Sequence, residues 1–191
     1  MKIKLVVRMV KGSPKGDGFE LVVCRCLSRW SGFPGWEDTE ARLLPFRRRS
    51  TNVQPVDGLW VGGADILAKP DRRWPFAGEA KKQEEWNFHQ LFTGRGPVLD
   101  DWWVQTRYNA KKHGLLPLLI FSHNNAPLYY VLQESVWRQL QKSVVEKDLI
   151  PVNLFALDVS GMAVVVGAIS DLIRTVPYSS VQRLSVPLTR T

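Results

Sequence analysis

The chain has 191 residues, of which 45% are hydrophobic and 23% are charged. This length suits one domain with a single core, and the composition excludes a chain that stays disordered for lack of apolar residues. The net charge of +8 at pH 7 favours a polyanionic partner, because each lysine or arginine that docks on a phosphate releases condensed counterions.

We expect no targeting or membrane segment. The N-terminal stretch MKIKLVVRMVKG has an apolar piece that is too short for the core of a signal peptide. The apolar runs near 115–121 and 162–169 are far below the roughly 20 residues that a membrane span needs. Cys24, Cys26 and the scattered histidines do not make a zinc quartet. We therefore expect a soluble, cytoplasmic protein whose cysteines are buried thiols in a reducing compartment.

The first half of the chain predicts a helix, a long loop and a strand hairpin. Apolar residues recur at helical spacing over 17–30. Residues 31–58 show no sustained pattern, so we expect a long, partly ordered surface segment. A strand is predicted at 59–68 and another at 76–81, and the Pro-Asp step at 69–73 predicts the turn between them.

The second half alternates helices and strands. A helix is predicted at 99–113, ended by Gly114, and another at 134–145. Strands are predicted at 115–121 and 128–132. Beyond them lie short apolar pieces at 152–157 and 162–169, and a Ser/Pro/Arg-rich end that we expect to be loosely held. The order indicates a mixed α/β domain with a small central sheet.

The stretch GGADILAKPDRRWPFAGEAKKQ carries the most informative constellation. Side chains two apart on a strand share a face, so Glu79 and Lys81 should lie together, with Asp65 on the neighbouring strand. Two carboxylates suit Mg²⁺, which takes oxygen ligands and can activate water against a phosphate. A lysine beside them can orient that water and offset charge on the phosphoryl oxygens.

These residues resemble a known group of enzymes. Asp65, a 13-residue gap and Glu79-Ala80-Lys81 match the signature of the PD-(D/E)xK nuclease superfamily. Lys15-Gly16-Asp17-Gly18-Phe19-Glu20 resembles the first helix of archaeal-type Holliday junction resolvases, and the stretch from Gln105 to Phe121 is similar to the helix and strand that follow their active site. The resemblance covers roughly 14–132 and leaves 133–191 without a counterpart.

The resemblance implies a fold, a reaction and a set of site residues. The fold is a restriction-endonuclease-like αβββαβ core, with 133–191 as an extension packed on it within a single domain, 1–191. The implied activity is metal-dependent, structure-selective endonuclease cleavage of DNA like that of a Holliday junction resolvase, by a homodimer that uses Mg²⁺ or Mn²⁺. The implied site residues are Asp65, Glu79, Lys81, Glu20 and Gln105, with Asp65, Glu79, Glu20 and the Ala80 carbonyl as metal ligands.

Basic and hydroxyl side chains supply the expected DNA contacts. Arginine forks match phosphate oxygens, and a basic loop suits an irregular substrate. The expected DNA-binding residues are Arg47, Arg48, Arg49, Ser50, Thr51, Lys82, Lys111 and Lys112.

Several alternatives stay open. Asp71, in a literal Pro-Asp pair, could replace Asp65, although its turn setting favours Asp65. Glu20 could be an ordinary surface residue of its helix. The enzyme could act on linear DNA as a restriction-like, nicking or recombination-linked nuclease. A DNA-binding protein that keeps the fold without catalysis is the alternative from another class, and residues 150–191 could form a dimer surface or an extra helix.

Overall fold

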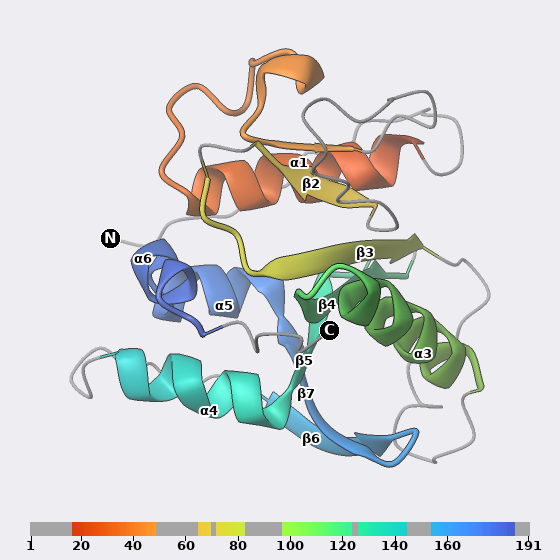
Figure 1. Cartoon of the computed structure of the whole chain (residues 1–191). Helices are drawn as coiled ribbons and strands as arrows, with labels where there is room; N and C mark the ends of the chain where they lie inside the picture. The colour runs from red at the N-terminus through yellow and green to blue at the C-terminus, as the bar shows by residue number, and fades with distance from the viewer. Residues whose placement is uncertain are drawn as a thin grey trace.

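The computed structural model describes residues 17–48, 65–69, 72–82, 97–123, 126–144 and 154–185. A seven-stranded sheet runs through the molecule with helices on both faces (Figure 1). The strands are β1 (Phe46–Arg48), β2 (Ile66–Ala68), β3 (Phe76–Lys82), β4 (Leu116–Ser122), β5 (Tyr129–Gln133), β6 (Leu154–Val159) and β7 (Met162–Ala168). The helices are α1 (Asp17–Trp30), α3 (Pro97–Lys112), α4 (Glu134–Ser143), α5 (Ile169–Thr175) and α6 (Tyr178–Gln182), with a 3-10 turn η1 (Ala41–Leu43).

The strand order confirms the predicted αβββαβ core. β1, β2 and β3 form an antiparallel meander, and α3 then crosses over so that β4 lies parallel to β3. The predicted pairing of the two strands of the hairpin is also present, with Ile66 opposite Gly78. Chain order α1, β1, β2, β3, α3, β4 therefore corresponds to the restriction-endonuclease-like arrangement.

The sheet is larger than the small one expected from the sequence. β5 pairs with β4, β7 with β5 and β6 with β7, all antiparallel, which gives the order β1-β2-β3-β4-β5-β7-β6. The turn between β6 and β7 also contacts α3, since the Ser160 hydroxyl donates to Asp100 in the first turn of that helix at 3.0 Å. The short apolar pieces expected near 152–157 and 162–169 are thus strands of the same sheet.

Alternation along the strands divides the core into two layers. On β4, Leu118 and Ile120 pack on the face that α1, α4, α5 and α6 cover, while Leu119 and Phe121 pack against α3. The α3 layer is completed by Trp103, which is fully buried. A strand covered on both faces should be apolar throughout, and β4 is buried along its whole length.

The prediction that the chain after β7 is loosely held is wrong for residues 169–185. α5 and α6 bury Leu172 and Val181 in the same layer as α1, and the Trp30 indole N–H donates to the Val176 carbonyl at 2.7 Å. Trp74 and Tyr178 stack in an aromatic cluster beside that bond. Two helices of seven and five residues are too short to show a clear apolar stripe in sequence, which explains the missed prediction.

The expected surface segment 31–58 also contains more structure than predicted. Phe46–Arg48 forms β1, and Phe46 is completely buried between α1 and the sheet. In the part of the chain that the structure describes, no helix combines the length and apolarity needed to cross a bilayer.

A close approach between β2 and β3 gives the first testable prediction. A Cβ added at Gly78 would lie 3.1 Å from the Cβ of Ile66, which is buried. Gly78→Ala is therefore expected to push β2 away from β3 and to lower the free energy of unfolding by about 1–3 kcal/mol, as overpacked cores do. Urea unfolding would measure this decrease in the free energy of unfolding. An unchanged midpoint would show that β2 and β3 can move slightly apart without loss of stability.

Candidate active site

Asp65 and Glu79 come together because β2 and β3 are neighbours. Asp65 directly precedes β2, and its Oδ2 accepts a hydrogen bond from the Ala80 backbone N–H at 3.1 Å. On β3, Phe76 and Ala80 face the α1 layer, whereas Ala77 packs under α3. Glu79 is on the α3 face by the same alternation, and only 1% of its surface is exposed.

Lys81 lies on the same face as Glu79, as the spacing predicted. Its Nζ is 3.4 Å from Glu79 Oε2, and its side chain is 22% exposed, so the ammonium sits at the rim of the buried carboxylate. On the other side, the Asn109 amide of α3 donates to Glu79 Oε1 at 2.6 Å. One carboxylate is therefore held between a cation on its own strand and an amide on a helix.

The environment makes Glu79 hard to ionise. Burial, the negative charge of Asp65 and a hydrogen bond shared with Asp65 raise the pKa of Glu79 from 4.5 to about 7. The amide of Asn109 and the charge of Lys81 oppose this rise without cancelling it. A carboxyl pair that strongly resists full ionisation is a frequent property of metal and catalytic sites.

The donor set fits a hard divalent cation. Glu79 Oε2 is buried and accepts no hydrogen bond from the residues described in the structure, and the charge of Asp65 acts on the same carboxyl group. An oxygen in that position would be satisfied by a cation that takes carboxylate and carbonyl oxygens together with water. Within the described ranges, no group of three or more His, Cys, Asp and Glu side chains is arranged to hold a metal. Asp65 and Glu79 would thus be the carboxylate pair at such an ion.

Glu20 lies in the first turns of α1, on a helix that covers the opposite face of the sheet from Glu79. Burial raises the pKa of the Cys24 thiol on the same helix to about 12, and the negative charge of the Glu20 carboxylate adds to this rise. Figure 1 shows α1 running in the opposite direction to β3, with its first residues on the side where β3 ends. The structure does not join Glu20 to Asp65 and Glu79 in a three-ligand group.

The helix residue that contacts the acid pair is Asn109, which the sequence analysis did not single out. Gln105 is exposed one turn earlier on α3, on the same side of the helix as Asn109. The sequence did contain a signal, since Asn109 lies four residues after Gln105 and one before the buried Ala110. Polar residues on the flank of a helix that packs over a buried acid are candidates for contact with it.

The expected DNA-binding residues divide into three groups. Lys82 is exposed at the end of β3, and Lys111 and Lys112 are exposed in the last turn of α3. Arg47 and Arg48 belong to the edge strand β1, but their side chains are outside the described part of the chain. The remaining predictions, Arg49, Ser50, Thr51 and the alternative acid Asp71, lie outside the described residues altogether.

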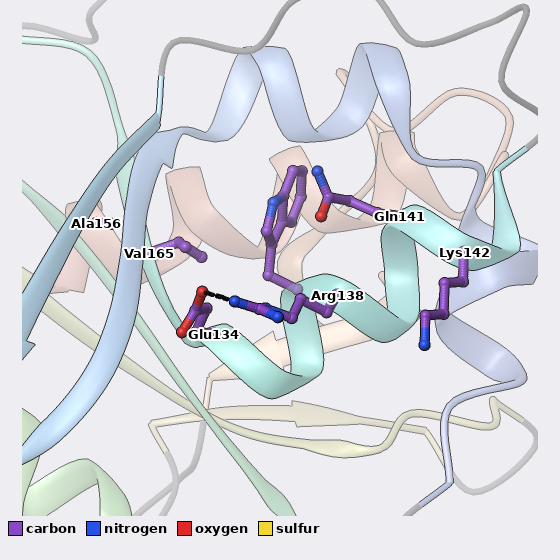
Figure 2. A pocket seen from close by; sticks show the side chains of 7 residues that line it. Glu134, Arg138, Gln141, Lys142, Ala156 and Val165 are labelled. Carbon is purple, nitrogen blue, oxygen red and sulfur yellow. Dashed lines mark hydrogen bonds and ion pairs between the residues drawn. The ribbon is translucent and has the colours of Figure 1, made fainter.

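A separate groove lies between α4 and the hairpin of β6 and β7. Its volume is about 540 Å³, and Figure 2 shows Arg138 directed at Glu134, with which it forms a 2.7 Å ion pair. The lining residues are Glu134, Trp137, Arg138, Gln141, Lys142, Ala156 and Val165. One paired carboxylate offers no counterpart to the Asp65–Glu79 arrangement, so the groove is not the candidate active site.

A known protein family matches most of the chain. The model of a family described as "Phage putative PDDEXK endonuclease" matches residues 11–182. Searches of curated proteins and of solved structures gave no significant match. The matched span runs from before α1 through α6 and includes Asp65, Glu79 and Lys81. It therefore extends well beyond 14–132 and covers the strands that complete the sheet.

Proposed function

Since the chain belongs to the phage putative PDDEXK endonuclease family, we propose that it is a metal-dependent deoxyribonuclease with its active site at Asp65, Glu79 and Lys81. The observation that carries the proposal is the buried Glu79 carboxyl group, on which the charge of Asp65 acts and whose Oε2 is 3.4 Å from the Lys81 ammonium. A structural ion pair on a strand would not need a second, partly buried acid next to it. We include the whole chain in one nuclease domain, because β5, β7 and β6 continue the sheet of the core.

Asp65 and Glu79 are the proposed ligands of Mg²⁺, with Mn²⁺ able to replace it. The Ala80 carbonyl is a third ligand in this proposal. Glu20 would be a further one, approaching from the first turns of α1, which lie on the side where β3 ends (Figure 1). When bound there, the ion supplies Lewis acidity to the scissile phosphate and lowers the pKa of water. The Ala80 N–H donates to Asp65, which fixes the orientation of that carboxylate.

Lys81 has the main proposed role on the protein side. Its ammonium is partly exposed at the rim of the buried Glu79 carboxylate, where it would be accessible to a water molecule and a phosphate oxygen. It would orient the attacking water and offset the charge that builds on the phosphoryl oxygens. The water oxygen bonds to phosphorus and gives up a proton, the P–O ester bond breaks, and the leaving alkoxide takes up a proton to become an alcohol. Gln105, exposed on the same side of α3 as Asn109, would contact the bound strand next to this centre.

DNA is the proposed substrate, held by basic residues around the site. Lys82 at the end of β3 and the exposed pair Lys111 and Lys112 on α3 would bind backbone phosphates. Arg47, Arg48, Arg49, Ser50 and Thr51 are proposed to add contacts from the segment around β1. We further propose that the enzyme is selective for branched DNA and acts as a homodimer, as a Holliday junction resolvase would, because the motifs around Glu20 and Gln105 resemble those enzymes.

The test is cleavage of labelled four-way junction, linear duplex and single-stranded DNA, each with Mg²⁺ and with EDTA. We expect metal-dependent cleavage of the junction in preference to the other two. Equal cutting of linear duplex would keep the active site but replace the resolvase-like activity by a restriction-like or nicking nuclease. Tight binding of DNA with no cleavage in Mg²⁺ or Mn²⁺ would contradict the enzyme and leave a DNA-binding protein of the same fold.

A further inference from the structure

We propose that Asn109 is a positioning residue that sets the orientation of the Glu79 carboxylate for metal binding. The inference rests on the proposed function, because it assigns a role toward the metal of that same site. Its basis is a single short contact, the 2.6 Å hydrogen bond from Asn109 Nδ2 to Glu79 Oε1.

The two oxygens of Glu79 have different surroundings. Oε1 accepts the hydrogen bond from Asn109, whereas Oε2 lies near Lys81 and receives no hydrogen bond from the described residues. The last torsion of a glutamate side chain is broad, so the carboxylate needs a directional partner to keep one oxygen in place. By holding Oε1, Asn109 leaves Oε2, which has no hydrogen bond within the described part of the chain and lies 3.4 Å from the Lys81 ammonium, as the oxygen that a cation would bind.

The packing of α3 on β3 places Asn109 at the required distance. Ala110 is buried against Ala77 of β3, and these two small side chains let the helix approach the strand closely. Thr106, one turn earlier, is also fully buried and donates to the Trp102 carbonyl. A short side chain such as asparagine can therefore reach Glu79 from a helix whose position the core already determines.

Replacing a residue that hydrogen-bonds to a metal ligand is expected to change metal affinity more than it changes the fold. Such a replacement typically costs about 10- to 100-fold in metal affinity or activity. We expect Asn109→Ala and Asn109→Leu to raise the Mn²⁺ dissociation constant of the DNA-free protein by about that factor. Leucine keeps a branched side chain without a donor, which separates the loss of the hydrogen bond from the loss of volume.

The experiment measures free Mn²⁺ by electron paramagnetic resonance during titration of the whole protein. Circular dichroism verifies that each variant is folded, and Gln139→Ala, an exposed amide on α4, is the matched control with unchanged affinity. A second readout is the Mg²⁺ concentration for half-maximal cleavage. It should rise in both Asn109 variants, and excess Mg²⁺ should restore most of their rate, whereas it should not restore Lys81→Ala.

The outcomes separate the inference from the function on which it rests. Wild-type Mn²⁺ affinity in both Asn109 variants, together with lost affinity in Asp65→Asn, would overturn the role of Asn109 and keep the metal site. Equal Mn²⁺ binding by the wild type and Asp65→Asn would overturn both, because the ion would then bind elsewhere.

Discussion

Glu79→Gln is expected to abolish cleavage and at the same time to stabilise the metal-free protein. The variant loses a carboxylate ligand, and the metal contributes several kcal/mol of transition-state stabilisation, so the rate should fall by at least about 10³-fold. The glutamine amide can still accept the hydrogen bond from Asn109, and it can donate to Asp65 as the protonated acid does. It therefore preserves the neutral arrangement that the buried site favours.

The stabilisation should depend on pH in a defined way. The pKa of Glu79 is about 7 in the folded protein and near 4.5 when the chain is unfolded. Below pH 4.5 both states are protonated and the variant has no advantage. As the pH rises toward 7, the unfolded chain releases a proton that the folded protein keeps, so the wild type loses stability. The loss is on the order of 3 kcal/mol, since a difference of one in pKa corresponds to about 1.4 kcal/mol.

Thermal unfolding in EDTA across pH 5 to 8 measures this effect. The Tm of Glu79→Gln minus that of the wild type should grow up to about pH 7 and then level off. Each kcal/mol shifts Tm by about 2–4 °C in a chain of this size, so the final difference should be several degrees. A Tm difference that is constant over the range would contradict the raised pKa of Glu79.

Lys81→Ala should remove activity while leaving metal and DNA binding nearly intact. The ammonium is 3.4 Å from Glu79 Oε2 but is partly exposed, so the fold does not depend on it. Loss of one donor aimed at developing negative charge costs about 10²- to 10³-fold in rate. Single-turnover cleavage at saturating Mg²⁺ measures the rate, and Mn²⁺ titration and DNA mobility shift measure binding. Lys82→Ala, on the exposed neighbour, is the matched comparison and should weaken DNA binding more than the rate.

A result in which Lys81→Ala cleaves like the wild type would move the catalytic role to another cation. Loss of folding in the variant is checked by circular dichroism, and Lys81→Arg distinguishes charge from geometry. Arginine keeps the charge with a wider, planar head group, so it should recover only part of the rate.

The hairpin that carries the acids could be predicted because local rules determine it. Pro-Asp marks a turn, alternation places Glu79 and Lys81 on one face, and antiparallel pairing brings Asp65 beside them. The helix predicted at 99–113 is observed at Pro97–Lys112 and was equally visible, since Gly114 follows its end with a φ of 62° that suits glycine. These features depend on residues that are close together in the chain, so a single sequence is enough to predict them.

Other features depend on contacts between distant parts of the chain. β1 has three residues and is a strand only because it pairs with Ile66–Ala68. Asn109 contacts a residue 30 positions away, so its spacing of four from Gln105 makes it a candidate but does not identify its partner. Strands β6 and β7 could be seen in the sequence only as apolar pieces. β7 pairs with β5, and α4 and further residues separate these two strands along the chain.

The hydrogen bond between Trp30 and Val176 has a consequence for biosynthesis. Its two residues are 146 positions apart in the chain. At about 5–20 residues per second, a ribosome needs roughly 7 to 30 s to synthesise the chain from Trp30 to Val176. During that interval α1 and the strands β1 to β3 are already made, but α5 and α6 cannot yet cover their apolar layer. The nascent chain thus lacks the finished core layer on the α1 face of the sheet until α5 and α6 are made, and contacts between distant residues of this kind form slowly. Slowing translation after β4 should lengthen the aggregation-prone period more than slowing it before α1.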